Sequence, residues 1–199
     1  MSNNGLMPAL SKNKSRAIIN TRQIECDRPL RIKGVSMIPV QLLRRFPFFS
    51  FMNETELKAI AMIAEELNLE PGEVLVEANT RAHALYFLTK GSLPYYMLVT
   101  SEHIPDYRQE YFVGYINPED IFGISALLEP YSYNATMRAD KPCTVIKIDA
   151  PALRALCEVD PQLSVGLMKA VAKAAMERLL MTRVLLVAQM AEVSKKSAG

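Results

Sequence analysis

Residues 118 to 149 form the segment whose residue types and spacing could build a binding site. It follows the turn signal Asn117-Pro118, and Gly123 then opens a short apolar run that ends at Leu128. This pattern predicts a short helix pressed against strands, with Gly123 letting the backbone approach another group closely. The free N–H groups at the start of a helix, together with the helix dipole, favour an anion. The segment therefore predicts an anion pocket.

The other reactive residue types show no arrangement that suits catalysis or metal binding. His83 and His103 are the only histidines, and the three cysteines, Cys26, Cys143 and Cys157, lie far apart in the sequence. None of them has the spacing of a zinc site, an iron–sulfur cluster or a nucleophile–base pair. We therefore expect no catalytic residues, no metal, and free thiols in a reducing cytoplasm.

Composition and charge exclude several other classes of protein. The chain is 50% hydrophobic and 22% charged, with a formal net charge of +2, so its overall charge indicates neither nucleic acid nor an acidic substrate. The first 45 residues are basic, with only Glu25 and Asp27 as acidic residues. They predict a solvated arm, and contact with a partner or nucleic acid is the alternative. Because there is no signal peptide and no apolar run near the ~20 residues of a membrane span, we expect a cytoplasmic protein without membrane contact.

Short alternating runs predict strands through the middle of the chain. Turn signals such as Pro71-Gly72 and Lys90-Gly91 separate these runs. About seven or eight short strands at this spacing favour a barrel or a double-sheet roll. The strands that we place are Val74–Glu77, Leu85–Thr89, Leu93–Thr100, Glu110–Ile116, Ala135–Ala139 and Cys143–Ile148.

Two helices with capping residues flank the predicted strands. Asn53 and Glu56 form a capping signature for the first helix, and Glu65-Glu66 is assigned to its solvated surface. Asp149 caps the second helix, Pro151–Val159. The apolar stripe predicted for the first helix is Leu57, Ile60, Ala61, Ala64 and Leu67.

The last predicted element is a single helix over Pro161–Val193, roughly 50 Å long. Two apolar stripes run along it, whereas a surface helix needs only one. We expect one stripe to cover the β unit and the other to pair with a second copy of the helix; a helix wrapped entirely within one domain is the alternative. The stripe that faces the β unit, interrupted by Arg178, is Val171, Ala174, Met181, Leu185 and Ala188. The predicted dimer interface is Met168, Ala172, Ala175, Leu179, Thr182 and Leu186.

The order of these elements resembles the effector domain of the cyclic-AMP receptor/fumarate-nitrate regulator family over about residues 40–193. The resemblance rests on Pro71-Gly72, Tyr86-Phe87-Leu88 before Gly91, the Pro-x-Asp-x-Phe-Gly run from Pro118 to Gly123, and Ala135-Thr136. It implies a mainly β fold with flanking helices, a double-stranded β-helix or jelly roll of the cyclic-nucleotide-binding kind, followed by a long C-terminal helix. The domains that we predict are a basic arm at 1–36, the β-roll domain at 37–160, the dimerisation helix at 161–193 and a tail at 194–199.

Two positions of the family's phosphate-binding cassette carry other residues in this chain. The resemblance implies a glutamate for the ribose hydroxyl where Ile124 stands and an arginine for the cyclic phosphate where Tyr133 stands. Losing such charge-assisted contacts costs ~1.5–3 kcal/mol each. Arg138 is a poor substitute because its position in a regular strand points to the opposite face. We therefore expect no cofactor and no tight binding of cAMP or cGMP. The candidate ligand residues at cassette-equivalent positions are Gly123, Ile124, Ser125, Ala126, Tyr133 and Asn134.

Three interpretations of the function stay open from the sequence. The first is a non-enzymatic regulatory or sensor domain that is degenerate for cyclic nucleotides and signals through a dimer helix, which a small-molecule effector would shift. The second is a ligand-free dimeric scaffold whose own side chains fill the pocket. The third is the truncated effector half of a transcription regulator that does bind a cyclic nucleotide. Only residues 194–199 follow the long helix, so we expect this chain alone to bind no specific DNA sequence.

Overall fold

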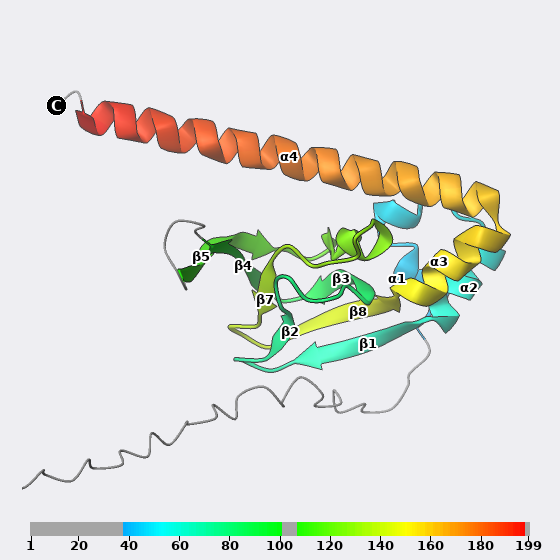
Figure 1. The fold of residues 1–199 in the computed structure, drawn as a ribbon. Coiled ribbons are helices and arrows are strands. Elements are labelled where there is room, and N and C mark those ends of the chain that lie inside the picture. Colours follow the sequence, from blue (N-terminus) through cyan, green and yellow to red (C-terminus); the bar gives the residue numbers. More distant parts are fainter. Residues whose placement is uncertain (1–37, 101–106, 198–199) are drawn as a thin grey trace, which may run out of the picture. The chain divides into compact units, whose positions relative to one another are not determined.

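The computed structural model describes residues 38–100 and 107–197, which belong to one compact unit. The predicted basic arm, Cys26 and His103 lie outside these ranges. Eight strands in the described residues form two antiparallel four-stranded sheets, with the orders β1-β8-β3-β6 and β2-β7-β4-β5 (Figure 1). This arrangement confirms the predicted jelly roll with flanking helices.

The strands and helices have the following bounds. The first sheet contains β1 (Ala64–Leu69), β8 (Cys143–Asp149), β3 (Ala84–Lys90) and β6 (Ile121–Phe122). The second contains β2 (Val74–Val76), β7 (Thr136–Arg138), β4 (Leu93–Thr100) and β5 (Arg108–Ile116). The α-helices are α1 (Val40–Leu43), α2 (Glu54–Met62), α3 (Ala150–Val159) and α4 (Pro161–Ser197), and the 3-10 helices are η1 (Pro47–Phe49) and η2 (Ile124–Leu127).

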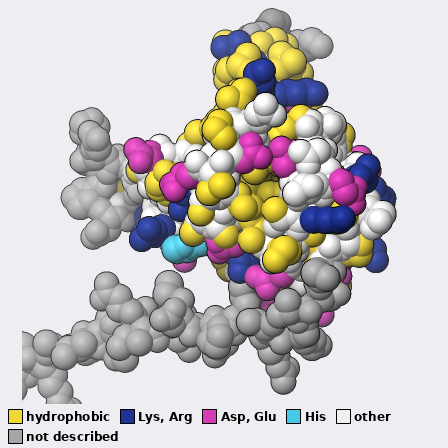
Figure 2. Space-filling view, turned by 90° about the vertical axis from the view of Figure 1, so that its right-hand side faces the viewer, with side chains coloured by type: hydrophobic (Ala, Val, Ile, Leu, Met, Phe, Trp, Pro, Cys, Tyr) yellow, Lys and Arg dark blue, Asp and Glu magenta, His cyan; other side chains and the backbone are white. Residues whose placement is uncertain are grey.

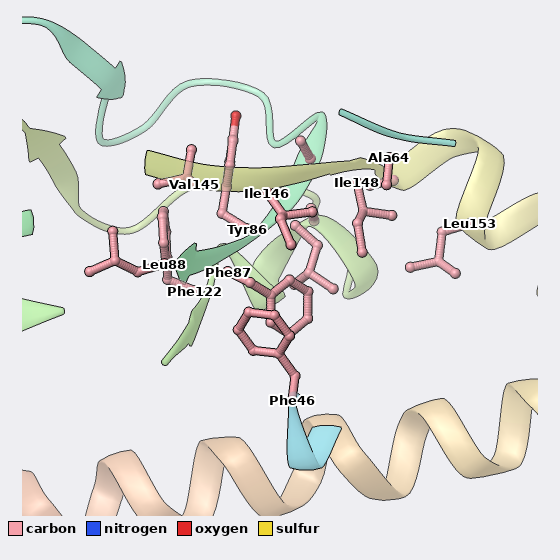
Figure 3. Packing of buried hydrophobic residues seen from close by; sticks show 14 of the residues in the cluster. Phe46, Ala64, Tyr86, Phe87, Leu88, Phe122, Val145, Ile146, Ile148 and Leu153 are labelled. Carbon is pink, nitrogen blue, oxygen red and sulfur yellow. The ribbon is translucent and has the colours of Figure 1, made fainter. Parts of the chain in front are cut away.

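Strand β3 is buried on both faces and forms the centre of the core. On one face the Phe87 ring lies 5.0 Å from the Phe46 ring and 4.8 Å from the Phe49 ring, measured between centroids. On the other face Tyr86 stacks on Phe122, with the centroids 5.1 Å apart. Figure 3 shows Phe46 beside Phe87, with Tyr86 directed to the opposite side. The aromatic residues around Pro47 therefore anchor η1 to the sheet that carries the cassette.

The capping of α2 is confirmed, but its predicted length is wrong. The Glu56 N–H donates to Asn53 Oδ1 at 3.0 Å, and the Asn53 N–H donates to the Glu56 carboxylate at 2.7 Å. The helix ends at Met62, and the chain enters β1 at Ala64, which pairs with Ile148 of β8. Ala64, Leu67 and the pair Glu65-Glu66 therefore belong to a strand. Pairing with β8, including the ion pair of Glu65 with Lys147 at 2.7 Å, overrides the helical propensity of this segment.

Strand bounds elsewhere agree with the prediction to within two residues, and β6 was missed because two residues carry no periodicity. The predicted cap of the next helix is confirmed, since Asp149 accepts a hydrogen bond from the Ala152 N–H at 2.8 Å. Within residues 38–100 and 107–197, none of the helices has the length and hydropathy that crossing a membrane requires.

Helix α4 is confirmed as a single element and extends four residues beyond the predicted end at Val193. Its first turns pack on the rest of the domain, because Leu163, Leu167, Val171 and Ala174 are buried. The stripe predicted to cover the β unit ends there, since Met181, Leu185 and Ala188 beyond Arg178 are exposed. That part of the prediction is wrong, because the domain reaches only the first half of the helix.

A glycine allows close contact between α4 and the segment after η1. A Cβ atom at Gly166 would lie 2.2 Å from a carbon of the Phe51 ring. Alanine is favoured over glycine in a helix by ~1 kcal/mol, whereas forcing an extra methyl group into a packed site costs ~1–3 kcal/mol. We therefore expect Gly166→Ala to stabilise a Phe51→Ala variant by about 1 kcal/mol and to stabilise the wild type less, or to destabilise it. Urea unfolding of the four proteins measures this coupling; equal effects of Gly166→Ala in both backgrounds would show that the ring moves aside without cost.

Candidate functional site

The six candidate ligand residues lie on η2 and on the segment that leads into β7. Gly123 precedes η2 with a φ of +74°, and a Cβ atom there would lie 2.9 Å from the Ala84 carbonyl oxygen and 3.4 Å from the Tyr133 ring. Both the backbone conformation and the lack of space require glycine. The close approach predicted from Gly123 is therefore confirmed, and the group that the backbone approaches is strand β3 of the same domain.

Tyr133, at the position where the resemblance implies a phosphate-binding arginine, is buried and bonded to β3. Its hydroxyl donates to the Ala84 carbonyl oxygen and accepts from the Ala84 N–H, both at 3.0 Å. Its own N–H donates to the Thr80 carbonyl oxygen at 2.9 Å, and its carbonyl oxygen accepts from the Asn79 N–H at 2.7 Å. The side chain thus spans from the β7 side to β3 and contacts the start of η2.

Tyr86 places a second phenol next to Tyr133. Burial raises the pKa of Tyr86 well above its ordinary value, and Tyr133 and Glu65 act in the same direction. The stacked ring of Phe122 covers its other side. The floor of the cassette is therefore aromatic and carries no positive charge from these residues.

The raised pKa of Tyr86 predicts a loss of stability at high pH. Above pH ~10 the unfolded chain ionises this phenol while the folded chain keeps its proton, so the unfolded state binds fewer protons and the free energy of unfolding falls as pH rises. One such group contributes about 1.4 kcal/mol per pH unit. Urea unfolding of the wild type and Tyr86→Phe from neutral to strongly alkaline pH should give the variant the shallower slope. The thiols of Cys143 and Cys157, whose pKa values burial also raises, are present in both proteins; parallel slopes would contradict the assignment to Tyr86.

The remaining candidate residues offer few polar groups. Ile124 packs against the core, and Ala126 is buried, with its N–H bonded to the Gly123 carbonyl oxygen at 2.9 Å. Ser125 is half-buried and Asn134 is exposed. Since η2 is a single 3-10 turn and one of its N–H groups is already bonded, the anion pocket predicted from the sequence is reduced to a small set of backbone donors.

Two arginines bond the backbone at the two ends of residues 121–126, the segment that contains β6 and η2. The sequence had assigned neither of them to the site. Arg154 of α3 donates to the Ala126 carbonyl oxygen, and its guanidinium lies 4.2 Å from the centre of the Tyr131 ring. Arg178 of α4 donates to the Ile121 carbonyl oxygen, and burial lowers its pKa. The one signal in the sequence was Arg178 itself, a charge inside an apolar helical stripe. Both helices are thus bonded directly to the cassette backbone.

Arg138 does not take the place of the missing cassette arginine. Its guanidinium pairs with Glu110 at 3.2 Å and lies 5.6 Å from the centre of the Tyr96 ring. This charge is therefore engaged with β5 and β4. In the described ranges there is no cluster of three or more His, Cys, Asp or Glu side chains suited to a metal ion, and Cys143 and Cys157 are free thiols.

Two cavities among the described residues lie away from η2. The larger, about 480 Å³, lies between η1, residues 119–121 and α4, and the smaller, about 50 Å³, lies beside Phe46 and Leu88. None of the six candidate ligand residues lines either of them. Tyr133 lies between η2 and β3, with its ring near Gly123 and its hydroxyl bonded to Ala84.

Comparison with known proteins agrees with this fold. The family model of the cyclic nucleotide-binding domain matches residues 66–160. A solved structure from Geobacter metallireducens, named as a cyclic nucleotide-binding protein, is 34% identical with a TM-score of 0.61, and the match covers 72% of this chain and 99% of that one.

Two curated proteins are more distant relatives. The cAMP-dependent protein kinase regulatory subunit of Dictyostelium discoideum is 25% identical over 118 residues, or 59% of this chain and 35% of that protein. The cAMP-activated global transcriptional regulator CRP of Pasteurella multocida is 31% identical over 90 residues, or 45% of this chain and 40% of that protein. The chain thus spans less than half the length of both curated relatives. The fold, the family match and the near-complete coverage of the Geobacter structure place this chain in the cyclic nucleotide-binding domain family.

Proposed function

We propose that this chain is a non-enzymatic regulatory domain whose cassette is closed by its own Tyr133, so that it binds neither cAMP nor cGMP tightly. The observation that carries the proposal is the pair of hydrogen bonds, each 3.0 Å, between the Tyr133 hydroxyl and the backbone of Ala84. In this proposal they hold the tyrosine side chain where the resemblance implies that a cyclic phosphate would bind. The regulatory roles named for the curated relatives support a regulatory rather than a catalytic function.

The energetics of a bound cyclic nucleotide support the same proposal. Ile124 offers no carboxylate to a ribose hydroxyl, and Tyr133 offers no cation to the phosphate. A nucleotide would also have to displace the Tyr133 hydroxyl and leave the Ala84 N–H and carbonyl without partners, which costs about 1–3 kcal/mol for each buried group. A phosphate would enter a neutral, aromatic pocket and lose its hydration there.

We propose further that the domain acts as a homodimer through α4. The six predicted interface residues, from Met168 to Leu186, are spaced alternately by four and three residues and all are exposed. Such a heptad stripe pairs with an identical stripe across a two-fold axis. We call this set of residues the dimer stripe.

The arginine contacts suggest how the cassette would communicate with the dimer. Arg178 bonds the β6 backbone next to Gly123, and the next residue, Leu179, belongs to the dimer stripe. A change in the conformation of residues 121–123 would therefore reach α4 through one partly buried hydrogen bond. A partner protein or a small effector that alters this segment would shift the orientation of the two helices in the dimer.

Isothermal titration of the wild-type chain with cAMP and with cGMP tests the proposal. We expect no saturable heat at ligand concentrations up to millimolar for either nucleotide. Saturable binding at micromolar concentration would contradict a closed cassette and would favour the effector half of a cyclic-nucleotide-dependent regulator. Thermal denaturation with the same ligands gives an independent measurement, because binding to the folded state alone raises the melting temperature.

A further inference from the structure

The larger of the two cavities lies beside α4, away from the cassette and from the dimer stripe. Its volume of about 480 Å³ falls in the range of ~300–1,000 Å³ that small-molecule sites have. None of the six dimer-stripe residues lines it. The dimer proposed above therefore uses no residue of this cavity.

The apolar part of the cavity lies between aromatic side chains near η1 and small residues of α4. Phe48 is half-buried, and Phe51 is 39% exposed. Gly166 and Ala170 line the cavity from α4, four residues apart and hence about one helical turn from each other. A larger side chain at either position would occupy this space, so their small size leaves room for the apolar body of another molecule.

Charges of both signs line the cavity from different segments. Lys169 and Lys173 belong to α4, whereas Glu119 and Asp120 belong to the turn before β6. Figure 2 shows Lys and Arg side chains on the lower part of the upper lobe, where α4 lies, and Asp and Glu side chains on the body below it. The Asp120 carboxylate already accepts a hydrogen bond from a backbone N–H of its own turn at 2.8 Å. The cavity thus has cations on α4 and carboxylates on the turn.

One charge of each sign lacks an ionic partner in the part of the chain that the structure describes. Neither Lys169 nor Glu119 forms an ion pair within 4 Å there, and Arg45, which lines the smaller cavity together with Glu119, is not within this distance either. Lys173, in contrast, lies 3.9 Å from Glu177. One ammonium group and one carboxylate are therefore available to a ligand.

The mixture of charges indicates which class of ligand the cavity takes. A simple anion would be repelled by three carboxylates, those of Glu119, Asp120 and Glu177. A simple cation would be repelled by the two lysines. A zwitterion with an apolar body matches both signs, and it gains a charge-assisted hydrogen bond at each end.

We propose that this cavity binds an apolar zwitterion, namely an amino acid or a short peptide with a large apolar side chain, and that this molecule is the effector of the domain. Its ammonium group pairs with Glu119 and its carboxylate with Lys169. Its side chain packs against Phe48 and Phe51, since aromatic rings favour such contacts. The inference rests on the proposed regulatory function and names the effector class for it.

The cavity borders the hydrogen bond that connects the cassette to α4. Ile121 lines the cavity, and its carbonyl oxygen accepts the hydrogen bond from Arg178. Glu177, the residue before this arginine, lines the cavity as well. A ligand in the cavity therefore contacts both segments that the hydrogen bond joins, and its binding favours one arrangement of α4 over another.

Isothermal titration of the full chain with L-phenylalanine and with L-leucyl-L-phenylalanine tests the site. We expect at least one of the two to bind saturably, with a dissociation constant of about 1 mM or below. Acetylation of the amino group and amidation of the carboxyl group each remove one charge from the ligand, and each should weaken binding about tenfold or more. The proposal is wrong if neither zwitterion saturates, or if both modified forms bind as tightly as their parent.

Variants of the cavity locate the binding. Lys169→Gln should weaken binding about tenfold and make the amidated ligand bind as tightly as its parent, because the partner of the carboxylate is gone. Lys141→Gln, at an exposed lysine outside the cavity, is the matched control and should bind as the wild type does. Ala170→Phe should abolish binding by filling the space, and thermal denaturation checks that each variant is folded. Unchanged binding by folded Lys169→Gln and Ala170→Phe would place the ligand elsewhere and overturn the proposal.

Failure of this site and failure of the proposed function give different results. A chain that binds neither the zwitterions nor a cyclic nucleotide keeps its closed cassette and loses the effector site. Saturable binding of cAMP or cGMP contradicts the closed cassette, whatever the zwitterions do.

Discussion

Replacing Ile124 with glutamate and Tyr133 with arginine in the same chain is expected to create measurable binding of cyclic nucleotides. The two substitutions supply a carboxylate for the ribose hydroxyl and a cation for the phosphate, at the two positions to which the resemblance assigns them. Each charge-assisted contact contributes ~1.5–3 kcal/mol, so the pair should tighten binding by about 10²- to 10⁴-fold. The removal of Tyr133 also opens the space between η2 and β3, because its ring no longer reaches Ala84.

Isothermal titration with cAMP and cGMP measures this gain, and three controls separate its causes. Tyr133→Phe keeps the ring but removes the hydroxyl, so it should bind no nucleotide and lose about 1–3 kcal/mol of stability for each of the two Ala84 groups that lose their partner. Each single substitution should recover only part of the gain. A double variant that is folded and still binds neither nucleotide would show that residues other than these two also close the cassette.

The elements that the sequence predicted most accurately are long ones with a regular alternation of apolar and polar residues along the chain. Strand β4 was placed at its observed bounds, and α4 was recognised over nearly its full length, because periodicity over many residues is a strong signal. Strand β1 was taken for the end of α2, since Ala-Glu-Glu-Leu suits a helix and only pairing with β8 makes it a strand. The structure therefore departs from the prediction where a distant partner decides the conformation.

The candidate site shows the same division between local and distant signals. The resemblance to the family assigned Gly123, Ile124 and Tyr133 to cassette positions from the order and spacing of residues along the chain. The partner of the Tyr133 hydroxyl, Ala84, lies 49 residues away, and no local pattern indicates that bond. Arg154 and Arg178 were missed for a related reason: each donates to a backbone carbonyl oxygen, an acceptor that every residue carries and that leaves no trace in the sequence.

Leu179→Glu is expected to convert dimers into monomers. Leu179 lies in the middle of the dimer stripe, so this variant tests the stripe directly. A dimer would bring the two carboxylates introduced by Leu179→Glu together near the two-fold axis and remove both from water. Burying an unpaired charge costs several kcal/mol for each ion, and the lost leucine contacts add ~2–5 kcal/mol. The dissociation constant should therefore rise by more than about 10³-fold.

Sedimentation velocity at micromolar concentration distinguishes the two states, and Lys173→Glu supplies the matched control. Lys173 is exposed and does not belong to the dimer stripe, so a glutamate there changes the charge of the helix without entering the stripe. This control should remain dimeric while the Leu179→Glu variant sediments as a monomer. If both sediment alike, the dimer stripe is not the contact, and α4 joins its copies through another face. Loss of the dimer without loss of helical circular dichroism would show that α4 is helical in the monomer, which is expected because Leu163, Leu167 and Val171 are buried within a single chain.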